Sequence, residues 1–328
     1  MRTSARFPAV APDAGHYESF YMKASDPEGG RAIWIRHTVH KRPGAEPTCA
    51  VWMTFFDEAY GGPRAAKEQF ASDSLGCPNG SYVRVGDSEI GPGWLRGKAE
   101  ADGVAASWGL RFTDHHDALR HLPSQWMYDA KLPKTKLLSP HPGALFDGTF
   151  EIGDERVEIT AWPGMVGHNW GAEHAERWVW IHGGGLDGGE PTDFLDIAAG
   201  QVKLGAVRTP WIANGAIVVD GERHRLGGLG HRARIEAEPR GCRFSVAGRG
   251  VKVSGTVGAD REQFVAWLYS DPLGGGHHAL NCSISDLEVT VSRRGEPDAR
   301  RRLRRGAAYE LGSRDTDHGV PLQPFDDG

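Results

Sequence analysis

The chain has 328 residues, 39% of them hydrophobic and 25% charged, and a formal net charge of −5 at pH 7. This balance excludes fibrous and disordered proteins, and the negative charge provides no general attraction to nucleic acid or to anionic membranes. Glycine is abundant at 45 residues. Each glycine inside a helix costs about 1 kcal/mol relative to alanine, so long helices are disfavoured and a turn-rich β protein is expected.

Three hairpins are predicted in the first half of the chain. The segments 31–40 and 48–57 are strand-like and flank a loop that contains Pro and Gly. The segment 93–112 contains two strands around an Ala-Asp-Gly turn, and 143–162 contains two around a Gly-Asp-Glu turn. These segments predict antiparallel pairing between neighbours in the sequence.

Helical signals are few. The segment 63–72 begins at a proline and is predicted to be a short helix, and 115–122 is predicted to be a second one. The segment 131–143 is rich in Pro and Lys and lacks periodicity, so we expect a loop or a linker there.

After residue 165, strand-like runs recur about every ten residues, which is typical of sandwiches and barrels. We therefore expect an all-β protein with few short helices. We place an N-terminal β domain over 1–160 and a C-terminal β domain over 161–328.

Targeting signals and paired cysteines are lacking in this sequence. No apolar run approaches the roughly 18 residues of a membrane span, and the first residues lack the apolar region of a signal peptide. None of the four cysteines forms a CxxC pair. We expect a cytoplasmic protein without an integral membrane segment, with free cysteines.

The glycine-rich segment 182–189 resembles two nucleotide or catalytic motifs but completes neither. Its GxGxxG spacing is followed by a predicted strand, whereas a dinucleotide site requires a helix there. Its HGGG resembles the oxyanion motif of lipases, but the chain has no GxSxG nucleophile motif. We expect a hairpin loop here, and no nucleotide cofactor.

Histidines and arginines raise two further possibilities. The adjacent pairs 115–116 and 277–278 would point to opposite faces of a strand, and no other histidine spacing matches a metal motif, so we expect no bound metal. The arginine-rich segment 293–305 is expected to be a polar hairpin with a GEPD turn. A basic patch for an anionic ligand is the alternative there.

Aromatic and titratable side chains are interleaved between residues 162 and 182. If 178–182 is a strand, Trp178, Trp180 and His182 share one face of it. Indoles mixed with titratable groups predict an apolar pocket with a few polar groups, and ordinary core packing of the same Trp side chains is the alternative.

Two motifs resemble those of a known family. ESFYMK at 18–23 resembles the E-x-W-Y-x-x signature of tocopherol cyclase and its relatives, and NWG followed by RWVWIH resembles their NWG…RWxW signature. The wider family includes carotenoid 1,2-hydratase (hydroxyneurosporene synthase) and fungal Diels–Alderases. The resemblance implies two lipocalin-like antiparallel β-barrels packed side by side, with a ligand between or within them.

The chain departs from these signatures at two positions. Phe20 stands where the first signature usually has Trp, and Gly167 stands where the second usually has an acidic residue, two positions before Asn169. If that acid supplies a proton in relatives, the role is lost or has moved in this chain. The reaction of a relative therefore cannot be transferred directly.

Family members act on isoprenoids or polyenes, so the resemblance implies a hydrophobic isoprenoid-like or polyketide-like small molecule and no cofactor. Protonation of a C=C bond needs an acid whose pKa is raised by burial, and Trp faces stabilise the resulting cation. A pericyclic relative needs only shape and a hydrogen bond that polarises a carbonyl.

The candidate catalytic residues are Glu18 as the acid of the first motif, His168 and Glu173 as substitutes for an acid at position 167, and His182 as a polar group facing the pocket. Structural roles are the alternative for each of them. The candidate substrate-binding residues are Tyr17, Phe20, Asn169, Trp170, Trp178, Trp180 and Asp196.

Three functions remain open. The first is a cofactor-independent enzyme, either a cyclase or hydratase (a lyase) or an isomerase. The second is a non-catalytic, lipocalin-like carrier of an apolar ligand, and the third is a structural protein whose Trp cluster is only core. A hydrophobic small molecule is the expected partner and nucleic acid is not; the sequence does not indicate an oligomeric state.

Overall fold

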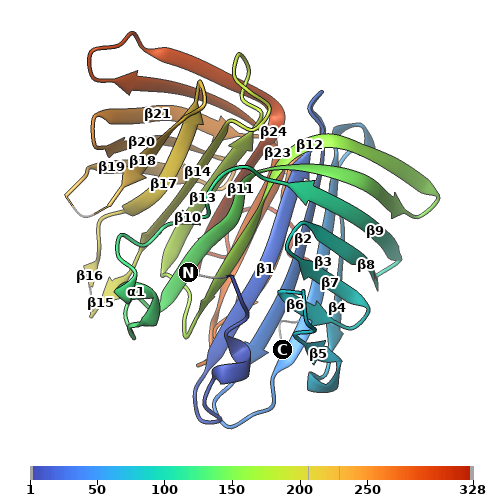
Figure 1. The fold of residues 1–328 in the computed structure, drawn as a ribbon. Helices are drawn as coiled ribbons and strands as arrows, with labels where there is room; N and C mark the ends of the chain where they lie inside the picture. The colour runs from blue at the N-terminus through green and yellow to red at the C-terminus, as the bar shows by residue number, and fades with distance from the viewer. Residues whose placement is uncertain (1–2, 206, 229, 326–328) are drawn as a thin grey trace.

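The protein is built from two large antiparallel β-sheets that lie side by side (Figure 1). The computed structural model describes residues 3–205, 207–228 and 230–325. It is 62% strand and 5% helix, with a nearly closed antiparallel barrel and a second sheet. The expected all-β, lipocalin-like fold is confirmed.

The first sheet has twelve strands within the described residues, in the order β4-β3-β2-β1-β12-β11-β9-β8-β7-β6-β5, with β10 paired to β11. Its curvature brings β4 against β8. Its strands are β1 (His16–Ser25), β2 (Arg31–Lys41), β3 (Thr48–Asp57), β4 (Arg64–Phe70), β5 (Leu75–Gly76), β6 (Val83–Val85), β7 (Ser88–Gly91), β8 (Trp94–Ala101), β9 (Val104–Thr113), β10 (Leu119–Arg120), β11 (Thr135–Ile152) and β12 (Glu155–Gly171).

The second sheet has ten strands within the described ranges, in the order β18-β17-β14-β13-β24-β23-β21-β20-β19, with β22 paired to β23. Its curvature brings β18 against β20. Its strands are β13 (Arg177–Gly184), β14 (Phe194–Gln201), β17 (Ile212–Val219), β18 (Glu222–Gly227), β19 (Ala233–Glu238), β20 (Gly241–Gly248), β21 (Val251–Gly258), β22 (Val265–Ser270), β23 (Gly276–Arg293) and β24 (Ala299–Ser313). A separate small ladder joins β15 (Lys203–Leu204) and β16 (Val207–Arg208).

The predicted hairpins are confirmed. The strand pairs β2–β3, β8–β9 and β11–β12 form the three expected in the first half, and β13–β14 encloses the glycine-rich loop. The arginine-rich segment joins β23 and β24 as a hairpin.

Both predicted helices are wrong. Residues 64–70 form β4, because Ala65 and Ala66 are buried on opposite faces and the segment pairs with β3, and this pairing overrides helix propensity. Part of 115–122 forms the short strand β10. In the part of the chain that the structure describes, the helical elements are one α-helical turn, α1 (Trp126–Asp129), and the 3₁₀ turns Phe7–Ala9, Glu58–Tyr60, Ser72–Ser74 and Arg261–Gln263.

The expected loop or linker at 131–143 is also wrong over most of its length, since β11 begins at Thr135. Its ladder with β12 is irregular between Leu138 and His141 and again between His141 and Ala144. Pro140 and Pro142 lie in these irregular stretches, where a residue without an N–H group is tolerated in a strand. The prolines therefore mark bulges instead of a chain break.

Strands β1 and β2 are buried on both faces, because each lies between the core of the first sheet and the second sheet. On β2, Ile33 and Ile35 pack into the first core, whereas Trp34 belongs to the core of the second sheet. The Trp34 and Trp267 rings lie 6.2 Å apart across the contact. Successive residues of β1 and β2 thus point either into the first barrel or toward the second sheet.

The chain passes from one sheet to the other between Gly171, which ends β12, and Arg177, which begins β13. The proposed domain limits 1–160 and 161–328 stay a prediction. Within the described residues, no helix is long and apolar enough to cross a membrane.

Candidate functional site

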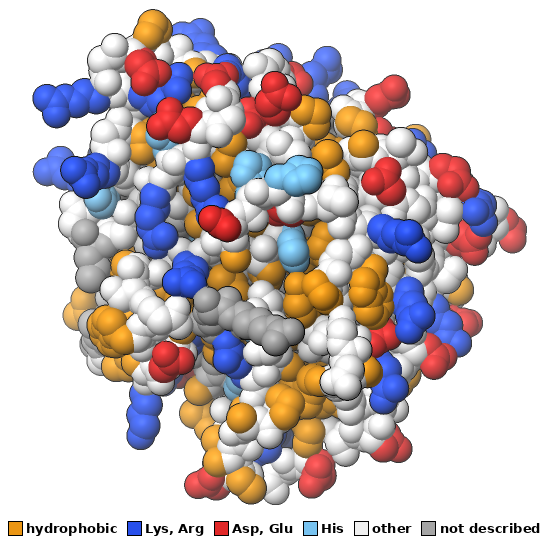
Figure 2. Space-filling model, viewed as in Figure 1, with side chains coloured by type: hydrophobic (Ala, Val, Ile, Leu, Met, Phe, Trp, Pro, Cys, Tyr) orange, Lys and Arg blue, Asp and Glu red, His pale blue; other side chains and the backbone are white. Residues whose placement is uncertain are grey.

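A cavity of about 290 Å³ lies between the two sheets, at the lower end of the range typical of small-molecule sites. In the space-filling view, hydrophobic and histidine side chains reach the surface near the centre of the face shown (Figure 2). The cavity is lined mostly by apolar and aromatic side chains from both sheets. Its lining residues are Tyr17, Tyr21, Trp34, Arg36, His121, Leu122, Pro123, Met127, Pro133, Thr135, Leu137, Asn169, His174, Ala175, Trp178, Val179, Trp180, Ala198, Ala199, Gly200, Val202, Ile212, Asn214, Tyr269 and Glu310.

One wall is a row of three residues on adjacent strands. Tyr21 of β1 lies opposite Arg36 of β2 on one side and opposite Gly167 of β12 on the other. Tyr21 and Arg36 both line the cavity. Residues opposite one another in a ladder share a face, so these two polar side chains are neighbours.

Gly167 leaves room for the ring of Tyr21. A Cβ atom at position 167 would lie 2.1 Å from Cζ and 2.5 Å from the hydroxyl oxygen of Tyr21. The phenol thus occupies the space that an acidic side chain at 167 would need. Gly312 likewise leaves room for the indole of Trp178, because a Cβ atom added at position 312 would lie 2.0 Å from it.

Burial raises the pKa of Tyr21 well above its ordinary value, and the nearby carboxylates of Asp196 and Glu310 raise it further. The hydroxyl is therefore neutral and keeps its proton at physiological pH. The rings of Tyr21 and Trp180 pack nearly perpendicular to each other, with 5.6 Å between their centroids. Tyr21 thus presents a neutral hydroxyl to the cavity.

Arg36 brings a buried positive charge to the same wall. Only 5% of its surface is exposed, and its guanidinium lies 4.0 Å from the ring centroid of Tyr269 and 5.2 Å from that of Trp52. These aromatic faces stabilise the cation. Its buried Nη1 has no hydrogen-bond partner among the described residues. Buried donors are normally paired, so this one is available to an acceptor in the cavity.

The opposite wall carries a buried carboxylate, Glu310 of β24. It accepts hydrogen bonds from the indole of Trp178 at 2.8 Å, from Asn281 at 3.1 Å and from the hydroxyl of Tyr269 at 3.4 Å. Glu310 thereby fixes two aromatic side chains of the cavity lining.

Asp196 of β14 organises a second buried network. It accepts hydrogen bonds from Ser139 at 2.6 Å and from the indole of Trp180 at 3.2 Å, and Nε2 of His121 lies 3.5 Å away. Burial alone would raise the pKa of Asp196, but His121, His182 and Ser139 outweigh it and lower this pKa. Asp196 is thus an ionised group that orients Trp180, and it does not itself line the cavity.

The first sequence motif divides between two faces. Tyr17 and Tyr21 face the cavity, whereas Glu18 and Phe20 point into the first barrel. Glu18 accepts hydrogen bonds from the backbone N–H groups of Arg6 and Phe7, and from His168 at 2.7 Å. The structure thus places Glu18 and Phe20 away from the cavity.

The pKa of Glu18 is set by competing effects. Burial alone would raise it, but hydrogen bonds and charge from His16 and His168 lower it to about 2. His168 is buried and stacks between Phe20 and Trp170, at 3.9 Å and 4.4 Å between ring centroids. Burial lowers the pKa of His168, although Glu18 opposes this shift.

The second motif is divided in the same way. Asn169 lines the cavity and accepts a hydrogen bond from Ser19, whereas Trp170 packs with Tyr128 outside it. Glu173 lies outside the cavity lining and pairs with Lys134.

His182 also lies outside the cavity lining. Its Nε2 hydrogen bonds to the carbonyl of Pro142 at 2.9 Å, and burial lowers its pKa to about 4. It shares a face with Trp178 and Trp180 as predicted, but it lies further along the strand. The structure brings together Tyr17, Asn169, Trp178 and Trp180 from the predicted set, and their roles stay predictions.

The sequence motifs did not single out Tyr21, Arg36, Tyr269 or Glu310. A signal for Tyr21 was present: alternation along 17–21 places it on the same face as Tyr17. The other three lie on β2, β22 and β24, and no spacing in the sequence links these strands to the motifs.

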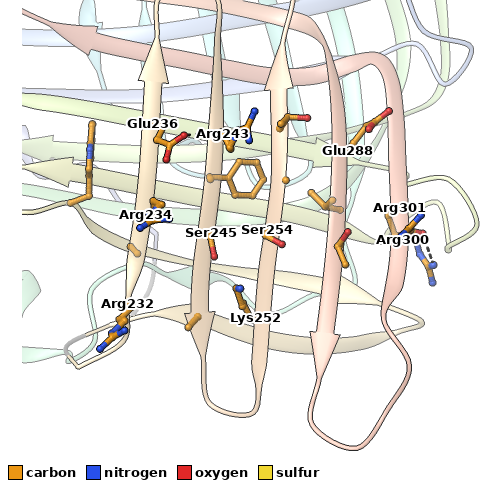
Figure 3. A pocket seen from close by; sticks show the side chains of 18 of the residues that line it. Arg232, Arg234, Glu236, Arg243, Ser245, Lys252, Ser254, Glu288, Arg300 and Arg301 are labelled. Carbon is orange, nitrogen blue, oxygen red and sulfur yellow. Dashed lines mark hydrogen bonds and ion pairs between the residues drawn. The ribbon is translucent and has the colours of Figure 1, made fainter.

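A larger, open hollow of about 1,590 Å³ lies on the polar face of β19, β20, β21, β23 and β24 (Figure 3). Ser245 of β20 and Ser254 of β21 lie opposite each other in it, and Arg234 and Lys252 are among the charged side chains around them (Figure 3). Several of its arginines pair with acids, such as Arg301 with Asp220 at 2.5 Å and Arg302 with Glu288. This face is polar and ion-paired, unlike the aromatic cavity.

Comparison with known proteins finds similar chains over most of this chain's length, although no family model matches it. The uncharacterized protein Rv0493c of Mycobacterium tuberculosis strain H37Rv is 25% identical over 297 residues, which is 89% of this chain and 86% of that protein. The crystal structure of CghA with Sch210972 aligns with a TM-score of 0.55 at 14% identity, covering 95% of each chain. A candidate AttH protein from Nitrosomonas europaea aligns with a TM-score of 0.51 at 15% identity, covering 93% of this chain and 96% of that one. The chain thus shares its two-sheet fold with these solved structures.

Proposed function

We propose that the protein binds a hydrophobic, carbonyl-bearing small molecule of isoprenoid-like or polyketide-like character in the cavity between the sheets. It converts this compound by cyclisation, hydration or isomerisation without a cofactor. The observation that carries the proposal is the pair of donors on adjacent strands of an aromatic cavity, the Tyr21 hydroxyl and the unpartnered Nη1 of Arg36.

The chemistry follows from these donors. A carbonyl oxygen that accepts hydrogen bonds from Tyr21 and Arg36 draws electrons from a conjugated C=C bond. Attack on that bond by water, by a hydroxyl of the substrate or by a diene then builds negative charge on the oxygen. Fixed donors in a site that excludes water stabilise this charge, and removing one such donor typically costs about 100- to 1,000-fold in rate.

Polarisation of a substrate carbonyl group fits this cavity better than protonation of an alkene by a strong acid. Glu18, with a pKa of about 2, is ionised at neutral pH and lies on the opposite face of β1. His168 is stacked beside it, and neither residue lines the cavity. We assign both to the stability of the first barrel. The small-molecule complex of CghA, a protein of the same fold, supports ligand binding by this architecture.

The test is a screen of purified protein against isoprenoid and polyketide compounds that carry a conjugated carbonyl, read by liquid chromatography and mass spectrometry. Cyclisation and isomerisation change retention time at constant mass, and hydration adds one water. The variant Ala198→Trp fills the cavity and is expected to abolish binding and conversion. Ala105→Trp, at an exposed position of β9, is the matched control and is expected to retain both.

Recovery of a bound compound in stoichiometric amount and unchanged would favour the carrier alternative. Conversion that survives Ala198→Trp would place the chemistry elsewhere and overturn the proposal.

A further inference from the structure

Three potential metal ligands from separate parts of the chain meet at the edge of the cavity. They are His174, between β12 and β13, Asp271, directly after β22, and His277 on β23. Each offers one ligand atom, and these atoms lie within 4.8 Å of one another. His174 also lines the cavity, where its ring stacks on Tyr17 at 3.9 Å between centroids.

A hydrogen-bonded His–Asp pair explains only part of this cluster. The backbone N–H and Nδ1 of His174 both lie 2.8 Å from Oδ1 of Asp271. The other oxygen, Oδ2, lies 3.3 Å from Arg314 and 3.5 Å from Nδ1 of His277. One carboxylate thus faces two imidazoles, and only one of them hydrogen bonds to it.

The contacts of His277 do not explain why its side chain is buried. Its side chain is fully buried, and neither of its ring nitrogens has a hydrogen-bond partner among the described residues. Nε2 of His174 is unpartnered in the same way. Buried polar atoms in proteins are normally hydrogen-bonded, so these unpaired nitrogens indicate a missing ligand.

The donor types of the cluster suit a cation, because imidazole nitrogens and a carboxylate oxygen are common ligands of divalent metal ions. Arg314 also contacts Glu176 at 3.2 Å, which can hold the guanidinium away from an ion.

We propose that His174, Asp271 and His277 bind one divalent transition-metal ion at the edge of the cavity. Two imidazoles and one carboxylate are a donor set typical of Zn²⁺, which leaves a further position for water or a ligand. In a tetrahedral site, ligand atoms at about 2.0–2.2 Å from the ion lie about 3.3–3.6 Å apart, so atoms now separated by up to 4.8 Å need to approach one another by up to about 1.5 Å. The site goes beyond the proposed function and does not depend on it.

The test is Zn²⁺ binding to the full chain after treatment with a chelator, measured by isothermal titration calorimetry and by metal analysis after dialysis. We expect one Zn²⁺ per chain. His277→Ala is expected to raise the dissociation constant for Zn²⁺ by about 100-fold or more. The melting temperature of the wild type is expected to rise when Zn²⁺ is added.

The matched control is His278→Ala. His278 is adjacent in sequence, and its Nδ1 lies 2.8 Å from Nε2 of His318. This variant and His318→Ala are expected to retain Zn²⁺ binding within about threefold, because neither residue belongs to the proposed site. If circular dichroism shows that His277→Ala does not fold, His174→Phe keeps the stacked ring, removes both nitrogens and is expected to show the same loss.

Absence of stoichiometric Zn²⁺ binding by the wild type would overturn the proposal. So would binding that His277→Ala and His174→Phe leave unchanged and that His318→Ala removes, because the ion would then sit on the pair His278 and His318.

Discussion

Tyr21 lies against Gly167 of the neighbouring strand so closely that a Cβ atom at 167 would come within 2.1 Å of the phenol ring. The position of the Tyr21 ring thus requires a glycine at 167. The hydroxyl of Tyr21 takes the place of a side chain at 167 and lies beside Arg36 on the cavity wall.

Substitution of Gly167 tests this contact. Gly167→Ala is expected to lower the free energy of unfolding by about 1–3 kcal/mol, because the added methyl group overlaps the Tyr21 ring. Urea denaturation measures the loss. In the Tyr21→Ala background the same substitution is expected to cost much less, since the ring is gone. Gly109→Ala is the control, because a Cβ there meets nothing within 4 Å; equal stabilities of the two alanine variants would contradict the contact.

The lowered pKa of Glu18 predicts that the stability of the fold depends on pH. Its pKa is about 2 in the folded protein, against an ordinary value of 4.5. A lowered folded-state pKa stabilises the fold above the unfolded-state value, and this contribution is lost as the pH falls from about 5 to about 2. We expect Glu18→Gln to cost about 3 kcal/mol at pH 7, and the gap to the wild type to narrow through that window.

Chemical denaturation at a series of pH values measures this gap. The exposed Glu158→Gln is the control and is expected to stay within about 0.5 kcal/mol of the wild type. A gap for Glu18→Gln that is constant from pH 7 to pH 3 would show that the ionised carboxylate does not stabilise the first barrel.

We predict that the hydrogen bonds of Asp196 stabilise the cavity wall. Asp196→Ala leaves the hydroxyl of Ser139 and the indole N–H of Trp180 without their acceptor. Loss of a buried, paired charge typically costs about 3–5 kcal/mol, and we expect a loss of that order in guanidinium denaturation. Asp187→Ala, in the exposed loop after β13, is expected to have little effect. Native-like stability of Asp196→Ala would rule out this orienting role.

Much of the fold was predictable from local pattern, whereas the cavity was predictable only in part. Hairpins with clear turns, such as β2–β3 and β8–β9, were correct because alternation and turn residues are local signals. The first part of β11 was missed because its prolines fall at bulges, and β4 was missed because pairing with β3 decides its conformation.

The site motifs marked the correct strands but not the correct face of each strand. Alternation over 178–182 placed Trp178 and Trp180 on one side, and both line the cavity. The same period applied to β1 separates Tyr21 from Glu18, which the candidate list did not do. Arg36 and Glu310 come from strands that meet only in three dimensions, so no sequence spacing could reveal them.

The kinetics of Tyr21→Phe test most directly the claim that the Tyr21 hydroxyl polarises the substrate carbonyl. The variant keeps the ring over Gly167 and removes only the hydroxyl, and Tyr60→Phe removes a hydroxyl from an exposed ring as a control. With a compound that the wild type converts, we measure its dissociation constant and its turnover number. The account predicts binding within about threefold of the wild type and turnover reduced by about 100- to 1,000-fold for Tyr21→Phe alone. Turnover by Tyr21→Phe equal to that of the wild type would contradict it.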